Sequence, residues 1–417
     1  MNWENQSKQT SFYQQQMEKR IPKDDILRVI DEKIDFSFVN ELTKHCYSKL
    51  GPIGYSPERL FRMLIVMYME NIPSERKLAE QLNVNLRYMW FTKTDLDSSV
   101  PEHSTFSVLR NRLGDELFKQ IFQKILSSII DLGIAHPESI SVDSTSVLAD
   151  VKLPKDDNMD TKQPISPSDP DARYGRTSDK NKFFGYRVNL MVDNDSACVL
   201  NIDAKPGNTE DYNIEEKFIK EPMNVNNIKP REAALDRGFD TYRIRNIFKE
   251  QKITAAIPVR ATKYDNKLYG KEDFNIDLKN KEVTCPANEQ LKYRGYCKSE
   301  SSYIFTGTEC DTCGLKNKCT TAKIRKLNVH EDYLLKNQAV KFNKTKRYRT
   351  IFKKRTCVER IIAEAKRYHG MLRARFRCLW KLKIQAYLTA IAINLKRAAR
   401  FFIERPSICT VALEAGP

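Results

Sequence analysis

The sequence lacks any run of apolar residues long enough to cross a membrane. A spanning helix needs about 18 or more consecutive apolar residues, and the best stretches, "LFRMLIVMYM" and "AYLTAIAINL", are much shorter. The first residues, "MNWENQSKQT", also lack the apolar segment of a secretory signal. We therefore expect a cytoplasmic protein with no membrane partner.

Acidic residues are nearly absent between residues 341 and 400. This segment holds 19 lysine or arginine residues but only two acids, Glu359 and Glu364. The net charge of this segment, +17, equals the formal net charge of the whole chain. The charges of all other residues therefore sum to zero. Aromatic residues are interleaved with the basic ones, as in "KRYRTIFKKR" and "LRARFRCLWK". This pattern favours binding to a nucleic-acid backbone, and a generic basic surface is the alternative.

The hydrophobic periodicity changes once along the chain. Helical patterns run from about residue 24 to 132, and residues 74–91 resemble a helix-turn-helix. Alternation begins at "ESISVDSTSV", and the order strand, strand, strand, helix, strand, helix, strand follows up to about residue 260. This order predicts an α/β fold whose sheet is partly antiparallel and then parallel. Residues 152–182 are expected to form a long loop.

The same patterns predict the domain organisation. We expect an N-terminal all-helical DNA-binding domain, an α/β core interrupted by a Cys-rich insertion, two further helical segments of the core parted near Gly370, and a tail. The boundaries are 1–135 for the helical domain, 136–260 for the first part of the core, 261–340 for the insertion, 341–403 for the later helices and 404–417 for the tail.

Three acids stand out by their context. Asp143 lies inside the first strand, where its side chain points away from Ile140 and Val142 because successive strand residues alternate faces. Asp236 ends a later strand, and ligands of open α/β sheets collect at strand carboxyl ends. Glu359 lies in a helix of the basic segment. A strand acid, a strand-end acid and a helical acid together are candidates for a metal-dependent catalytic site.

Glu359 belongs to a helix with two stripes. The apolar stripe that we expect to pack on the core consists of Val358, Ile361, Ile362 and Ala365. A second stripe lies beside it and consists of Phe352, Arg355, Glu359 and Lys366. An ordinary ion pair between residues i and i+4 explains why Arg355 and Glu359 lie on one stripe. Such a pair does not explain why Lys366 lies on the same stripe.

These residues resemble a known signature. The spacing Phe352, Arg355, Glu359, Lys366 is similar to the Tyr-(2)-Arg-(3)-Glu-(6)-Lys pattern of one group of DDE transposases of bacterial insertion sequences, with Phe in place of Tyr. "SVDSTSV" and "ALDRGFD" are similar to the two aspartate motifs of these enzymes, and the resemblance covers about residues 25–400.

The resemblance implies a function and a site. It implies a ribonuclease H-like catalytic core in which Asp143, Asp236 and Glu359 hold two Mg²⁺ ions, and in which Mn²⁺ can replace Mg²⁺. Carboxylate oxygens suit this hard cation, and two ions clamp the attacking and leaving oxygens of an in-line displacement. The enzyme would cut DNA at the ends of its own element and join them to target DNA. The alternatives are a nuclease that does not join, and a catalytically inactive DNA-binding protein.

DNA is the expected partner, both as transposon ends and as target. A homodimer on paired ends and a bacterial, nucleoid-associated location follow from the resemblance. The residues expected to contact DNA are Arg355, Lys366, Lys353, Lys354, Arg367, Arg373 and Arg375.

The cysteines are concentrated in one place. Five of the ten fall between residues 285 and 319, and a cytoplasmic chain keeps its thiols reduced, so metal is favoured over disulfides. The candidate ligands are Cys285, Cys310, Cys313 and Cys319. Four thiolates suit tetrahedral Zn²⁺, an iron–sulfur cluster is a further option, and the absence of metal is a third. Cys297 could replace Cys285, and His330 is a less favoured ligand.

Overall fold

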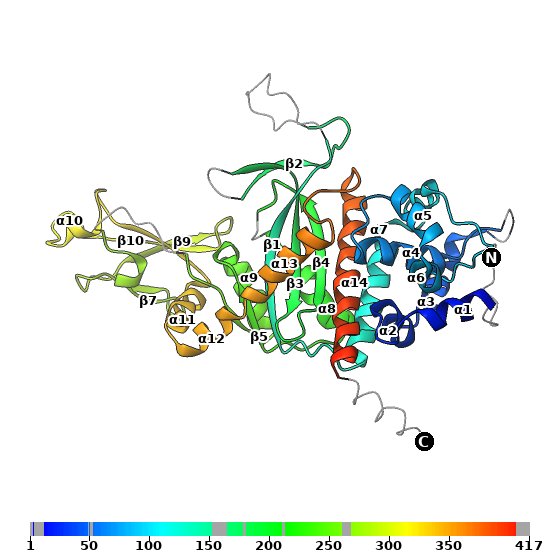
Figure 1. Cartoon of the computed structure of the whole chain (residues 1–417). Coiled ribbons are helices and arrows are strands. Elements are labelled where there is room, and N and C mark those ends of the chain that lie inside the picture. The colour runs from blue at the N-terminus through cyan, green and yellow to red at the C-terminus, as the bar shows by residue number, and fades with distance from the viewer. Residues whose placement is uncertain are drawn as a thin grey trace. The chain divides into compact units, whose positions relative to one another are not determined.

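The computed structural model describes residues 3, 12–48, 50, 53–151, 165–177, 181–210, 213–260 and 268–405 (Figure 1). The predicted tail therefore lies outside the described residues, except for its first two positions. The chain forms two compact units, of which the first contains residues 1–235, 252–254 and 351–417. The second contains residues 236–251 and 255–350. These units do not follow the domain boundaries given above, which remain predictions. None of the described helices is long and apolar enough to cross a membrane.

The first unit begins with helices, as the periodicity predicted. They are α1 (Phe12–Arg20), α2 (Ile26–Lys33), α3 (Phe38–Thr43), η1 (Lys44–Cys46), α4 (Pro57–Met69), α5 (Glu75–Val84), α6 (Leu86–Phe91) and α7 (His103–Asp131). Every residue of α4 is buried, and Ser56 caps its start by accepting a hydrogen bond from the backbone N–H of Arg59. The turn between α5 and α6 lies within residues 74–91, which resemble a helix-turn-helix. Four of the six residues of α6 are buried. Little of α6 is therefore left to read a DNA groove.

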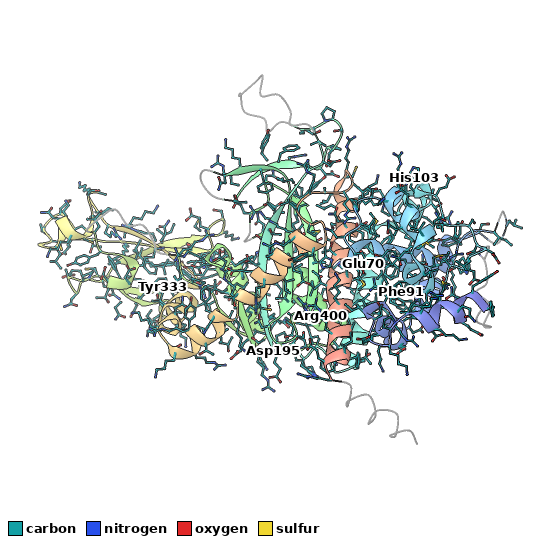
Figure 2. The ribbon with its side chains drawn as sticks, in the orientation of Figure 1. Glu70, Phe91, His103, Asp195, Tyr333 and Arg400 are labelled. Atoms are coloured by element: carbon teal, nitrogen blue, oxygen red, sulfur yellow. The ribbon has the colours of Figure 1, made fainter. Side chains whose placement is uncertain are left out.

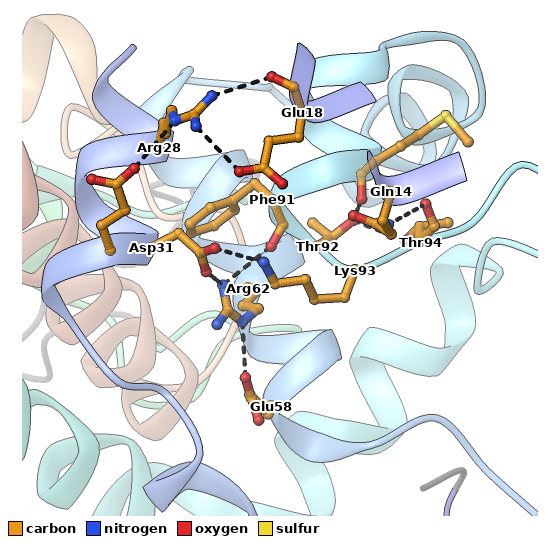
Figure 3. Close-up of polar contacts among 12 residues, drawn as sticks. Gln14, Glu18, Arg28, Asp31, Glu58, Arg62, Phe91, Thr92, Lys93 and Thr94 are labelled. Carbon is orange, nitrogen blue, oxygen red and sulfur yellow. Dashed lines mark hydrogen bonds and ion pairs between the residues drawn. The ribbon is translucent and has the colours of Figure 1, made fainter. Parts of the chain in front are cut away.

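A buried charge network holds these helices together (Figure 3). Arg62 of α4 donates to Asp31 at 2.5 Å, to Glu58 at 2.9 Å and to the carbonyl of Phe91 at 3.2 Å. Lys93 completes the network with a 2.6 Å hydrogen bond to the second oxygen of Asp31. Because each charge has a partner of opposite sign, the burial of Arg62 leaves no uncompensated charge.

A six-stranded sheet follows the helices in the chain. Its strands are β1 (Ser139–Leu148), β2 (Arg173–Arg176), β3 (Lys182–Asp193), β4 (Val199–Pro206), β5 (Glu232–Leu235) and β6 (Thr254–Ala256). The order is β2-β3-β1-β5-β6, and β4 also pairs with β3. Strand β1 is antiparallel to β3 and parallel to β5, so the predicted change of direction is confirmed. Strand β2 corrects the loop expected for residues 152–182, because Arg173–Arg176 pair with β3.

The later helices of the first unit pack on this sheet. Helix α8 (Glu216–Val225) and helix α14 (Leu379–Glu404) contact β4, and α13 (Thr356–Tyr368) contacts β1 and β3. Helix α14 also contacts α2, α4 and α7. Its buried Asn394 accepts from the backbone N–H of Val199 at 2.7 Å and donates to the carbonyl of Val199 at 2.8 Å. This side chain thereby ties α14 to the backbone at the start of β4.

The second unit has its own strands and core. Its strands are β7 (Asn275–Asp277), β8 (Glu282–Thr284), β9 (Lys292–Cys297), β10 (Ser302–Thr306) and β11 (Lys326–His330), and its helices include η3 (Arg237–Phe239), α9 (Tyr242–Glu250), η4 (Lys271–Asp273), α10 (Lys316–Cys319) and α11 (Tyr333–Asn343). Helix α12 (Lys346–Lys353) spans the division between the units. The sheet order is β11-β10-β9, with β7 and β8 forming a separate pair. One hydrophobic cluster of this unit consists of Phe274, Val283, Leu291, Phe305, Leu327, Val329 and Tyr333.

Candidate functional site

Asp143 lies in the middle of β1. Its Cα is opposite that of Leu190 on β3, and its side chain is 17% exposed, whereas Val142 beside it is fully buried. The backbone N–H of Ser144 donates to one carboxylate oxygen of Asp143 at 2.8 Å. Strand β3 pairs with this backbone at Asp143, and the pairing with β5 ends one residue earlier at Val142, so the backbone that carries the carboxylate is held in the sheet.

Glu359 lies in the first turn of α13, which packs on the strand that carries Asp143. Val358, Ile361 and Ala365 are buried, as predicted for the apolar stripe, while Ile362 is only partly buried. The helical segment expected before Gly370 is not continuous. It breaks into α12 and α13, and Arg355 lies at the junction as the residue that precedes α13.

Arg355 connects the two carboxylates. Its guanidinium donates to Asp143 at 2.9 Å and to Glu359 at 2.5 Å. The same guanidinium lies 5.8 Å from the centroid of the Phe352 ring, a distance at which the face of an aromatic ring attracts a cation. Phe352, Arg355 and Glu359 of the second stripe therefore interact through Arg355. Arg355 also contacts Asp143, which lies 212 positions earlier in the chain.

Lys366 is the fourth residue of this stripe and differs from the others. Burial lowers the pKa of its ammonium group. No carboxylate pairs with it among the residues that the structure describes. A partly buried cation without an anion is costly, so an external anion would stabilise this position.

Asp236 is the third acid that the sequence predicted. The parallel register pairs Val142 with Leu235 at the end of β5, and Asp236 is the next residue of the chain and the first of the second unit. Within that unit, the loop after it is held by Asp240. The Asp240 carboxylate accepts from the Arg245 side chain at 2.8 Å and from the backbone N–H of Arg260 at 2.6 Å. Sequence reasoning did not single out Asp240, although the motif "DRGFD" contains it.

The other predicted DNA-contacting residues differ in their surroundings. Lys353 and Arg367 are exposed, Lys354 lies 3.5 Å from Glu232, and exposed Arg373 lies 3.7 Å from Asp150. Arg375 donates to the carbonyl of Ile72 at 2.6 Å and to the Asn71 side chain at 3.2 Å. Its guanidinium also stacks over Tyr68, 4.6 Å from the ring centroid. The contacts of Arg375 are therefore internal to the protein and connect the last helices to α4.

The four candidate cysteines share one cavity in the second unit. Cys285, Cys310, Cys313 and Cys319 all line it, together with Arg325. Burial raises the pKa of the Cys319 thiol, and the three other cysteines raise it further. Cys297 on β9 does not line the cavity. His330 stacks on Tyr242 with ring centroids 3.8 Å apart, and its Nδ1 accepts from the backbone N–H of Asp332. Cys297 and His330 therefore do not line the cavity that contains the four candidate cysteines.

A group that the sequence did not reveal lies at the start of α14. Ligand atoms of Asp169, Asp171 and Cys378 all lie within 4.8 Å of one another, which is close enough to hold a metal ion. The buried Asp169 accepts from the Tyr186 hydroxyl at 2.5 Å and from the backbone N–H of Cys378 at 3.0 Å. Asp171 accepts from the N–H of Leu379 at 2.9 Å. Both carboxylates thus already cap the helix.

Comparisons with known proteins point to one class. Residues 15–112 match a family model described as a transposase domain (DUF772), and residues 284–399 match a transposase DDE domain. The second match contains the four cysteines, Arg355, Glu359 and Lys366, and neither match reaches Asp143 or Asp236. The two family models support a DDE transposase, which is a DNA transposase.

Solved structures add little to this result. The chain is similar to a piggyBac transposase in a synaptic complex with hairpin DNA, at 13% identity, covering 93% of this chain and 75% of that chain, with a TM-score of 0.35. It is also similar to a Mos1 transposase in a paired-end complex with the left transposon end, at 12% identity, covering 50% and 61%, with a TM-score of 0.17. Both scores are too low to carry an argument. No curated protein matches the chain.

Proposed function

We propose that the protein cuts DNA at the ends of its own insertion sequence and joins the 3′-hydroxyl ends to target DNA. The observation that carries this proposal is the contact between Asp143, Arg355 and Glu359. Two acids from a strand and a helix face one guanidinium, and 216 positions of sequence separate them. Chance pairing of surface charges would not be expected to select the two acids that the motifs single out.

The donor set of the proposed site fits a hard divalent cation. Asp143 and Glu359 offer carboxylate oxygens, which Mg²⁺ and Mn²⁺ prefer. Asp236 is the proposed third ligand, on the grounds of its sequence motif and its position directly after Leu235. When bound, two such ions activate the attacking oxygen and stabilise the leaving one. A strand order of β4-β3-β1-β5-β6, with β1 antiparallel to β3 and parallel to β5, supports the proposal of a ribonuclease H-like core.

The remaining residues of the stripe orient the proposed substrate. Arg355 neutralises Asp143 and Glu359, and its guanidinium would be available to a DNA phosphate when these oxygens hold cations. Lys366 supplies a cation without an acidic partner in the described chain, which suits a phosphate close to the scissile bond. Holding that phosphate in line with the attacking oxygen is a large part of the rate enhancement expected for such a site.

We propose structural zinc at the cysteine cavity. Thiolates are soft ligands that select zinc or an iron–sulfur cluster over Mg²⁺, so this metal is distinct from the catalytic ones. The small hydrophobic core next to the cavity, which includes Leu291 and Phe305, supports a stabilising role for the metal. Cys285 and Cys319 pack against this core.

The test uses linear DNA that carries the sequences flanking the gene on both sides. Wild-type protein with Mg²⁺ is expected to cut near the gene boundaries and to join those ends to a second DNA. Asp143→Asn, Asp236→Asn and Glu359→Gln should each lower cleavage by about 10²–10³-fold or more, because each removes transition-state stabilisation. Binding to DNA should change little, since it depends mainly on basic residues.

The matched control is Asp195→Asn, an exposed acid in a turn between β3 and β4 (Figure 2). It should leave cleavage unchanged. Cleavage without joined products would identify a nuclease that does not transfer strands. Binding without any cleavage by the wild type would identify an inactive DNA-binding protein. Wild-type rates in Asp143→Asn would show that the wrong carboxylate has been chosen.

A further inference from the structure

A basic pocket lies beside α13 on a different flank from the carboxylates. It is lined by Arg360, Arg367 and Tyr368 of α13 and by Arg397 and Arg400 of α14, with Glu364 as its acidic member. Figure 2 labels Arg400 toward the carboxyl end of α14. Arg360 and Arg367 each follow a residue of the Glu359–Lys366 stripe by one position. At about 100° per residue, the pocket is therefore rotated by about 100° from that stripe.

The acidic member of the pocket is already neutralised. The Glu364 carboxylate forms an ion pair with Arg397 and lies 3.8 Å from the buried His369 ring. Burial opposes its ionisation, but the nearby His369 ring and the charge of Arg397 outweigh burial and lower its pKa. The pocket thus keeps a negative charge that its own partners balance.

The other three arginines are open to solvent. Arg360, Arg367 and Arg400 are exposed, and no carboxylate pairs with them in the part of the chain that the structure describes. Tyr368, 54% exposed, lines the same pocket, and the Arg367 guanidinium is 5.9 Å from its ring centroid. Three exposed arginines around one exposed aromatic ring form a surface that attracts an anion.

We infer that this pocket binds backbone phosphates of duplex DNA, away from the scissile phosphate. The inference rests on the proposed function, because it requires a DNA substrate. Arg360 and Arg367 are two helical turns apart, roughly 10 Å along the axis. Phosphates of one strand advance about 3.4 Å per nucleotide along the duplex, so the two side chains can reach phosphates a few nucleotides apart. Such contacts set the position of the duplex and do not read its sequence.

The test is a salt series of binding to a fluorescein-labelled 25-base-pair duplex of arbitrary sequence. The variant Arg360→Gln/Arg367→Gln/Arg400→Gln should weaken binding at low salt by more than tenfold. It should also flatten the log–log salt slope by roughly 0.9 for each phosphate that the variant no longer neutralises. The control Lys124→Gln/Lys217→Gln/Lys229→Gln removes three exposed cations elsewhere in the first unit and should change the slope much less.

The outcomes separate this inference from the proposed function. Equal slopes for the arginine and lysine variants, with a wild type that binds DNA, would overturn the inference alone. A wild type that binds no duplex would overturn the proposed function as well. A duplex with the gene-flanking sequence should lose affinity by the same factor, and a loss confined to that duplex would overturn the assignment to the backbone. If the triple variant unfolds early in a thermal scan, Arg367→Gln and Arg400→Gln decide the question singly.

Discussion

The carboxylate site and the cysteine cavity are built over very different lengths of chain. Asp143 and Glu359 meet across 216 positions because β1 and α13 pack together. The four cysteines of the cavity lie within 35 consecutive residues, next to a core of seven buried side chains. The first site depends on packing between elements that lie far apart in the chain, whereas the second depends on a local cluster of side chains. A metal held by the cysteines would add stability to that local cluster.

The strongest way to break this comparison is to remove a cysteine. Cys313→Ser should abolish bound metal and destabilise the second unit by several kcal/mol, on the order of the free energy that structural zinc supplies to small domains. Elemental analysis should find about one zinc per wild-type chain and none in the variant. Limited proteolysis should then cut near residues 284–330 first.

Cys297→Ser is the matched control, because Cys297 belongs to the same unit but does not line the cavity. It should keep both the metal and the protection from protease. Iron in place of zinc would change the identity of the metal. The cysteine cavity would still be a metal site, so its contrast with the carboxylate site would stand. Freshly purified wild-type protein with neither metal would contradict the proposal.

A second test of the comparison replaces Lys366, the fourth residue of the stripe that contains Glu359. Since burial lowers the pKa of this lysine, Lys366→Gln should leave the free energy of unfolding unchanged within about 0.5 kcal/mol or raise it slightly. Affinity for DNA should nevertheless fall, with a salt slope reduced by roughly one unit. Thermal unfolding and a binding titration measure the two effects. A large loss of stability with normal binding would show that Lys366 supports the fold and does not contact DNA.

The smallest expected effect concerns the contact between α13 and α14 at Glu364. Its pKa in the folded protein lies below the ordinary value of 4.5, so its contribution to stability is complete above about pH 4.5. That contribution is lost as the pH falls through the lower, folded pKa. Glu364→Gln should cost at most about 1 kcal/mol at pH 7, and the difference from wild type should shrink in acid. Urea unfolding at pH 7 and pH 3.5 measures it, and a pH-independent difference would count against the ionised contact.

Much of the α/β unit was predictable because its signals are local. Alternation located β1 at "ESISVDSTSV", and the helical periodicity located the helices that precede it. Strand β2 was missed because its four residues follow a polar stretch with turn-forming residues and have no apolar alternation of their own. The break at Arg355 was missed because its backbone remains in the helical region of φ and ψ, so no proline or glycine marks it.

The site was predictable in its members but not in its contacts. The motif spacing selected Asp143, Arg355 and Glu359, yet it gave no sign that Arg355 would pair with both acids. Arg375 looked like a DNA contact because it lies in a basic run, and its bonds to Ile72 and Asn71 depend on residues three hundred positions away. Asp169 and Asp171 lacked a signal because their partner, the start of α14, follows more than two hundred positions later.

Helix α14 has a consequence for how the protein is made. It is synthesised after every element that it contacts, including α2, α4, α7 and β4. Until Asn394 has left the ribosome, the backbone groups of Val199 lack the side chain that satisfies them. An unfinished chain would therefore present an open strand edge and uncovered apolar helix faces, which are the usual targets of chaperones and proteases. Translation products that stop before α14 should be short-lived, and full-length chains should accumulate in their place.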